Sequence, residues 1–227
     1  MAKEEFKVRL DEMKLNDDYA EYKVKGGSPR WQLANEVLYK MCEDNMLHED
    51  ADVIASKVFL IGRSYAVAVE RQHRGEPKGD SYYYEEVVPE LKSLELDKAI
   101  AEINSKSNIE DSLEPIFKIH NELSNFGTKA ENGEEGDARR PSFASKYLHF
   151  HCRDKVFIYD ERARKAIARY VISGNYKQFN GYDNRDYQIF VYRARAVLKK
   201  LLEKDSNMGP RELDDFLLWV EENKVQK

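Results

Sequence analysis

Apolar residues recur at intervals of three and four along most of the chain, which predicts a protein built from helices. In residues 31–41 the apolar positions are Trp31, Leu33, Ala34, Val37, Leu38 and Met41. Ser28 and Pro29 precede this stripe, and a serine is a good N-cap while a proline suits the first helical turn. We therefore expect a helix here whose apolar stripe is buried.

Residues 50–73 form the most apolar segment, with apolar side chains around most of a helical circumference. Such a helix belongs at the centre of a core. Arg63 and Tyr65 interrupt it, so Arg63, and Arg71 two turns later, must be ion-paired or face a pocket. Further helices are expected over residues 4–15, 82–104, 109–125, 185–204 and from Pro210 onward.

Two segments depart from the helical pattern. The sequence VFIY at residues 156–159 is the longest stretch that resembles a strand. Residues 127–138, GTKAENGEEGDA, are acidic and glycine-rich, which predicts a mobile surface loop. The whole pattern predicts an all-α protein, in which residues 1–227 form a single globular domain of two lobes.

Composition narrows the class of protein. The chain is 41% hydrophobic and 35% charged, which is typical of a soluble globular protein. No apolar run reaches the roughly 18 residues that a membrane span needs, and the charged start MAKEEFKVRLDEMK lacks the apolar region of an export signal. Cys42 and Cys152 are the only cysteines, too few for a disulfide framework. We expect a cytoplasmic protein that is a monomer.

Positive charge is concentrated in one part of this acidic chain. The net charge is −5, yet residues 139–169 contain nine basic and only three acidic residues, a local excess of +6. The basic residues are Arg139, Arg140, Lys146, Arg153, Lys155, Arg162, Arg164, Lys165 and Arg169. A solvated helical face and a surface that contacts nucleic acid both fit this pattern.

Three side chains that can bind metals lie inside this basic segment. His149, His151 and Cys152 span four residues, and on a helix 149 and 152 share a face while 151 points elsewhere. Zinc sites usually draw four ligands from paired spacings, which the other histidines do not supply. A helical metalloprotein is therefore a weaker alternative than histidines hydrogen-bonded in the core, and we expect no metal or other cofactor.

A lysine and an aspartate at two helix starts suggest another chemistry. A helix is expected to begin at Pro141, and the backbone amides around Ser142 and Ser145 could bind a phosphate. Lys146 lies one turn further, and Asp160 opens the next helix, where the dipole favours a carboxylate. An antiparallel helix pair would bring amine and carboxylate together, ready to attack the anomeric carbon of a nucleotide. An ordinary surface lysine and a capping aspartate remain the alternative.

The stretch SFASKYLHFHCRDKVFIYDERARKAI, residues 142–167, resembles the lysine and aspartate segment of helix-hairpin-helix DNA glycosylases. It looks most like the oxoguanine glycosylase branch, with Lys146, Asp160 and Arg162 at the matching positions. It departs from that family in two ways: no G-x-G precedes the lysine, and the spacing between lysine and aspartate is short. Both departures concern how DNA would dock.

The resemblance implies a DNA base-excision enzyme that flips a damaged or modified base of double-stranded DNA, oxidised guanine by default. Asp160 would activate Lys146, which would attack C1′, expel the base and form a Schiff base before β-elimination. Phosphate contacts would come from Arg139, Arg140, Ser142, Ser145 and Arg162. The base-pocket candidates are Tyr147, His149, Phe150, Tyr159, Phe216 and Trp219. A non-enzymatic DNA-binding or partner-binding module remains the alternative.

Overall fold

The computed structural model describes residues 7–26, 31–71, 73, 77–126, 138–176 and 182–225. Helices make up 70% of the structure, and the described residues contain one two-stranded sheet, which confirms the prediction of a predominantly helical chain. The chain divides into two compact units, unit 1 (residues 1–31 and 157–227) and unit 2 (residues 32–156). Within the described residues no helix has both the length and the apolar composition needed to cross a bilayer.

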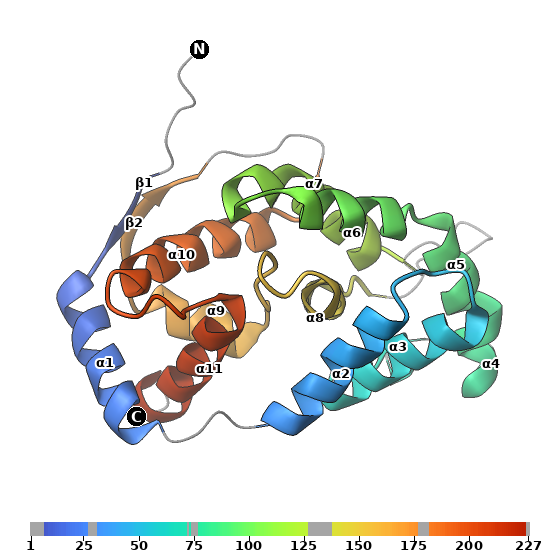
Figure 1. Cartoon of the computed structure of the whole chain (residues 1–227), viewed down its shortest axis with the longest axis horizontal. Helices are drawn as coiled ribbons and strands as arrows, with labels where there is room; N and C mark the ends of the chain where they lie inside the picture. The colour runs from blue at the N-terminus through green and yellow to red at the C-terminus, as the bar shows by residue number, and fades with distance from the viewer. Residues whose placement is uncertain are drawn as a thin grey trace, which may run out of the picture. The chain divides into compact units, whose positions relative to one another are not determined.

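Unit 1 joins the two ends of the chain. Strand β1 (Lys7–Leu10) pairs antiparallel with β2 (Val171–Asn175), with Lys7 opposite Asn175. The helical elements are α1 (Glu12–Lys25), α9 (Glu161–Ala168), α10 (Arg185–Leu202), α11 (Pro210–Val220) and the π-helical turn η3 (Glu221–Val225). Figure 1 shows the blue helix α1 beside the red helix α11. Leu15, Ile167 and Phe216 are fully buried in this unit.

The sequence prediction of a helix over residues 4–15 is wrong for residues 7–10. Residues 7–10 form β1, and the helix begins only at Glu12, after Asp11 caps it by accepting a hydrogen bond from the Lys14 amide at 3.1 Å. Residues 156–159 form no strand. Strand β1 forms because it pairs with β2, which lies far away in the sequence. A local sequence pattern could therefore not identify β1.

Unit 2 is helical. Its elements are α2 (Gln32–Asp44), α3 (Ala51–Ser64), the 3₁₀ turn η1 (Val69–Arg71), α4 (Asp80–Tyr82), the π-helical turn η2 (Tyr83–Val87), α5 (Val88–Ser93), α6 (Leu96–Ser105), α7 (Ile109–Ser124) and α8 (Pro141–His151). Helix α8 packs against α2, α3 and α7. Eight consecutive residues of α8, from Phe143 to Phe150, are buried, so α8 lies at the centre of this unit.

Helix α3 is the core helix that the sequence predicts, with Ile54, Val58 and Ile61 at 0% exposure, although it ends at Ser64 and not at residue 73. Of the stripe expected in α2, only Leu38 is buried, and the rest of that prediction is wrong. Leu33 is 80% exposed, and the stripe that is buried comprises Asn35, Leu38, Tyr39 and Cys42. Both faces have helical spacing, and only packing against α3 and α8 selects the second. Residues 28, 29 and 127–137, which include most of the expected acidic loop, lie outside the described residues.

Candidate active site

Lys146 is a buried residue of α8 in unit 2. Its side chain is only 4% exposed, which argues against an ordinary surface lysine. The amine Nζ donates to Ser142 Oγ at 3.2 Å and to the carbonyl oxygen of Tyr65 at 3.4 Å, and it lies 5.6 Å from the centroid of the Tyr65 ring. Residues 142 and 146 are one turn apart, and helical side chains lean toward the preceding turn. The amine is thereby placed near the beginning of α8.

The residues that precede Lys146 are held in different ways. Arg139 is exposed and donates to Asn121 Oδ1 at 3.4 Å. Arg140 is only 2% exposed, and its guanidinium donates to the Phe126 carbonyl at 2.6 Å and stacks 4.4 Å above the Phe126 ring. Ser145 is buried and donates to the carbonyl of Ser142 at 2.9 Å. Of the two arginines, Arg139 has its side chain exposed to solvent and Arg140 does not.

Asp160 opens α9 in unit 1, as the sequence suggested. It is half-buried, and its Oδ1 accepts a hydrogen bond from the Ala163 amide at 3.0 Å, which makes it the N-cap. Two residues on, the Arg162 guanidinium donates to Glu222 Oε1 at 2.8 Å and lies 3.6 Å from Glu221 Oε2. The capping reading of Asp160 is therefore correct, and it is compatible with a second role because a carboxylate has several acceptor positions.

Lys146 and Asp160 belong to different units, 2 and 1 respectively. Each half of the candidate catalytic pair has its own supporting contacts within its unit. The pairing of this amine with this carboxylate, which the sequence suggested from an antiparallel arrangement of two helices, stays a prediction.

Three of the base-pocket candidates are core side chains of unit 2. Tyr147 is 0% exposed and its hydroxyl donates to His48 Nε2 at 2.7 Å. His149 is also 0% exposed, with Nε2 2.6 Å from the Tyr39 hydroxyl and Nδ1 2.7 Å from the Val156 carbonyl oxygen. Phe150 is 2% exposed and packs against Tyr39. A flipped base could reach these rings only if the core opened.

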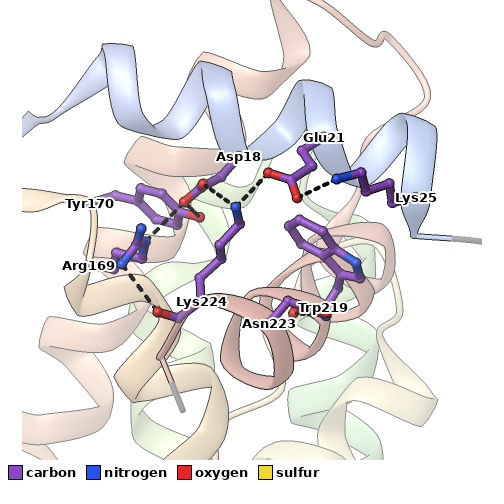
Figure 2. A network of polar contacts seen from close by, with 8 residues as sticks. All are labelled: Asp18, Glu21, Lys25, Arg169, Tyr170, Trp219, Asn223 and Lys224. Atoms are coloured by element: carbon purple, nitrogen blue, oxygen red, sulfur yellow. Dashed lines mark hydrogen bonds and ion pairs between the residues drawn. The ribbon is translucent and has the colours of Figure 1, made fainter. Parts of the chain in front are cut away.

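The candidates in unit 1 differ in their exposure. Phe216 is fully buried, with its ring 5.5 Å from that of Tyr19. Trp219 is half-buried, and its ring lies 5.7 Å from the Tyr22 ring and 5.8 Å from Lys224 Nζ. Figure 2 shows the indole beside the Lys224 side chain. Tyr159 is half-buried as well. Trp219 and Tyr159 are thus the aromatic candidates with surface that a base could contact.

In unit 1, acidic side chains form ion pairs with several of the basic residues of the segment 139–169. Arg162 faces Glu221 and Glu222, Lys165 Nζ lies 2.8 Å from Glu161 Oε1, and Arg169 Nε donates to Asp18 Oδ2 at 3.0 Å. Asp18 and the two C-terminal glutamates lie far outside the basic segment in the sequence. Figure 2 shows the Asp18 carboxylate between Arg169 and Lys224. Counting charge within the segment therefore overestimates the positive charge that it presents.

The metalloprotein alternative has no geometric basis. Both ring nitrogens of His149 are in hydrogen bonds, and His151 uses Nδ1 to donate to the Tyr147 carbonyl at 2.8 Å. Burial raises the pKa of the Cys152 thiol to about 12, which disfavours the thiolate that a metal requires. Over the part of the chain that the structure describes, no group of three His, Cys, Asp or Glu side chains is placed to hold a metal ion.

The expectation for the arginines of the apolar segment is confirmed for Arg63. Its guanidinium forms an ion pair with Glu70 and lies 5.3 Å from the centroid of the Phe59 ring. Arg71 is exposed in η1 and therefore needs no buried partner. Ion pairing explains Arg63 and solvent exposure explains Arg71, so neither arginine requires a pocket.

No protein-family model matches the chain, and neither a curated protein nor a solved structure matches it. The resemblance to DNA glycosylases therefore depends on residues 142–167 alone.

Proposed function

We propose that this protein is a DNA base-excision glycosylase with lyase activity, which acts on double-stranded DNA that contains a damaged or modified base. Oxidised guanine is the default substrate. The observation that supports the proposal best is the burial of Lys146: an amine only 4% exposed, beside Ser142 Oγ at the start of a helix. A lysine that serves only solubility does not occupy such a position, and a desolvated amine is suited to covalent catalysis.

The proposed chemistry proceeds through an imine between Lys146 and the sugar. The flipped nucleotide presents C1′, and the Asp160 carboxylate stabilises the positive charge that grows on the sugar as the base departs. The amine nitrogen of Lys146 forms a bond to C1′, and the electrons of the glycosidic bond leave with the base. Opening of the sugar gives a Schiff base, and β-elimination then breaks the strand on the 3′ side.

Phosphate contacts are assigned according to exposure. Arg139 and Ser142 are the proposed contacts near Lys146, because Arg139 faces solvent and Ser142 is half-buried in the first turn of α8. Arg140 and Ser145 would support this turn from the interior. Arg162 would have to exchange the carboxylates of Glu221 and Glu222 for a phosphate, so its contribution to affinity should be smaller than that of Arg139.

The test is cleavage of a panel of lesion-bearing duplexes, with and without borohydride. The wild-type protein should nick at least one duplex and form a covalent protein–DNA adduct with it. Lys146→Gln should abolish both products and retain DNA binding. Lys165→Gln is the matched control, because Lys165 is exposed in α9 and paired with Glu161. Circular dichroism of each variant separates a loss of chemistry from a loss of folding.

Asp160→Asn separates the charge of Asp160 from its capping role. Asparagine caps helices about as well as aspartate, so α9 should remain intact while the negative charge is removed. The expected loss in cleavage rate is ~10²-fold or more. An adduct that forms equally well in Lys146→Gln would assign the chemistry to another amine. If no duplex is nicked or trapped, the proposal is wrong.

A non-enzymatic DNA-binding module is the second candidate. The burial of Tyr147, His149 and Phe150 favours it, because these rings are occupied by core contacts. Such a module would bind DNA without nicking it. Arg139→Gln should then weaken binding to all duplexes equally and reduce the salt slope by about one, whereas a glycosylase would show an additional preference for the lesion.

A further inference from the structure

Helix α2 carries an apolar stripe that the folded unit 2 does not bury. Leu33, Val37 and Met41 follow one another at intervals of four residues, so they lie on one face of the helix. Leu33 is 80% exposed and Val37 is 58% exposed, while Met41 is half-buried. The other face of α2 packs into the core, where Tyr39 contacts Phe150 of α8. Apolar residues at helical spacing are typical of a face that is buried, so the exposure of this stripe needs an explanation.

A pocket connects the stripe with the neighbouring helix α3. Its volume is about 220 Å³, and it is lined by Met41, Asn45, Asp52, Val53 and Ser56. The C-terminal end of α2 therefore lies beside the N-terminal turns of α3, and the two helices are in contact (Figure 1). One turn after Ser56, Leu60 is exposed on the same face of α3. We call Leu33, Val37, Met41, Val53, Leu60 and the pocket the α2–α3 surface.

Exposed apolar side chains are concentrated around these two helices. Among the described residues twelve large hydrophobic side chains are exposed, and six of them lie between residues 33 and 60. These six are Leu33, Val37, Met46, Leu47, Phe59 and Leu60. Single exposed apolar residues are normal on a soluble protein, whereas a cluster of them marks a surface that binds another molecule.

The charged residues around the α2–α3 surface are mainly acidic. Between residues 32 and 64 the exposed carboxylates are those of Glu36, Glu43, Asp44, Glu49, Asp50 and Asp52. The exposed cations in this range are Lys40 and Arg63, which leaves an excess of four negative charges. Both cations form ion pairs, Lys40 with Asp44 and Arg63 with Glu70. An apolar surface with an acidic border is complementary to an apolar surface with a basic border.

We propose that the α2–α3 surface binds an amphipathic helix of a protein partner, whose apolar face packs on Leu33, Val37 and Leu60 and whose lysines or arginines face the carboxylates. Helices bind such surfaces through apolar side chains that are three and four residues apart. One large apolar side chain of the partner enters the pocket between Met41 and Val53, as the anchor residues of protein interfaces do. A basic residue beside this anchor meets Asp52 in the wall of the pocket.

Charge distinguishes a basic partner from a second copy of this chain. In a symmetric dimer the same surface patch faces itself, so the six carboxylates of one copy would meet the six of the other. Like charges that are brought together at an interface oppose association, whereas opposite charges favour it. The net charge of −5 on the whole chain acts in the same direction. We therefore assign the surface to a basic helix of a different protein.

The α2–α3 surface is separate from the candidate DNA chemistry. The Lys146 amine contacts Ser142 Oγ and the Tyr65 carbonyl, and none of these residues belongs to the surface. A protein that cleaves no DNA would therefore leave this proposal standing, and a protein that binds no basic helix would leave the glycosylase proposal standing.

The test uses the full-length protein and fluorescently labelled synthetic peptides of about 18 residues, which form about five helical turns. The probe peptide has leucine at helical positions i, i+3, i+4 and i+7 and lysine elsewhere. One control peptide has the same composition in scrambled order, and a second has glutamate in place of lysine. Fluorescence anisotropy at physiological salt, where long-range charge attraction is screened, should show binding of the probe at least ~10-fold tighter than that of either control.

Two matched variants locate the binding site. Val37→Lys places a positive charge in the centre of the surface, and Met13→Lys makes the same change of charge at a side chain that is 75% exposed on α1 of unit 1. Both replaced side chains face solvent, so both proteins should fold, which circular dichroism checks. Val37→Lys should weaken binding of the probe at least ~10-fold, and Met13→Lys should leave it unchanged.

Two results would overturn the proposal in favour of a general attraction to an acidic protein. These are equal binding of the probe and the scrambled peptide, and equal effects of Val37→Lys and Met13→Lys. Sedimentation velocity tests the second copy: the wild-type protein should remain a monomer at the concentrations of the titration. A dimer that Val37→Lys dissociates would assign the surface to self-association and overturn the assignment to a basic partner.

Discussion

Removing the Asp18 carboxylate should destabilise unit 1 far more than removing a neighbouring carboxylate on the same helix. Asp18 is 6% exposed, and its Oδ2 accepts from Arg169 Nε at 3.0 Å and from the Tyr170 hydroxyl at 3.1 Å. Its Oδ1 lies 3.6 Å from Lys224 Nζ. Figure 2 shows how this carboxylate links α1 to the end of α9 and to η3. Asp18→Ala leaves these donors without their shared acceptor.

The size of the effect follows from burial. Hydrogen bonds to a charged group contribute about 1.5–3 kcal/mol each, and breaking a buried ion pair costs about 3–5 kcal/mol. Arg169 is 26% exposed and keeps a bond to the Lys224 carbonyl at 3.4 Å, so the loss should be near the lower limit, about 3 kcal/mol. For a chain of this length that corresponds to a fall in Tm of about 6–12 °C.

Glu21→Ala is the matched control. Glu21 lies one turn further along α1 and pairs with Lys224 and Lys25, and its side chain is 34% exposed, against 8% for that of Asp18. Exposed ion pairs contribute little to stability, so this variant should unfold close to the wild-type midpoint. Asp18→Asn, which keeps an acceptor but not the charge, should fall between the two.

The assay is urea unfolding followed by tryptophan fluorescence, because Trp31 and Trp219 both belong to unit 1. Far-ultraviolet circular dichroism reports on both units, and a difference between the two curves would reveal independent unfolding. If Asp18→Ala and Glu21→Ala lose the same small amount of stability, the buried network contributes no more than surface charge, and the reasoning from burial is refuted.

Three further predictions concern unit 2. Burial lowers the pKa of His120 to about 3. The unfolded chain therefore binds a proton near pH 6.5 that the folded chain does not, so stability is complete above pH 6.5 and falls by up to about 1.4 kcal/mol per pH unit below it. Urea midpoints between pH 7 and 5 should show a smaller slope for His120→Gln, and an unchanged slope would assign the acid sensitivity elsewhere. Burial raises the thiol pKa of Cys42 and Cys152 to about 12, so both should react with a disulfide reagent only as fast as the protein opens, and a prompt reaction in native buffer would contradict this. A Cβ on Gly62 would lie 3.2 Å from Ala68 Cα, so Gly62→Ala should cost about 1 kcal/mol of unfolding free energy despite its better helix propensity, and a gain in the urea midpoint would show that the backbone yields.

The sequence by itself determined the helical class and several local details. The helix-capping role of Asp160, the start of α8 at Pro141 and the core position of α3 follow from residue type and spacing, because caps and periodicity act over a few neighbouring residues. The strand β1 could not be found in this way, since its hydrogen bonds go to β2 at the other end of the chain.

Tertiary structure decided which of the possible faces and charges matter. Helix α2 carries two faces of helical spacing, and packing buried the one that contains Asn35 and Tyr39. Arg162 and Arg169 of the basic segment form ion pairs with Asp18, Glu221 and Glu222, which lie far from it in the sequence. These ion pairs neutralise part of the positive charge that was counted within the segment. Solvent exposure and ion pairing depend on which segments meet in space. For that reason a lysine such as Lys57 looks ordinary in the sequence, and only the folded protein shows that it is buried.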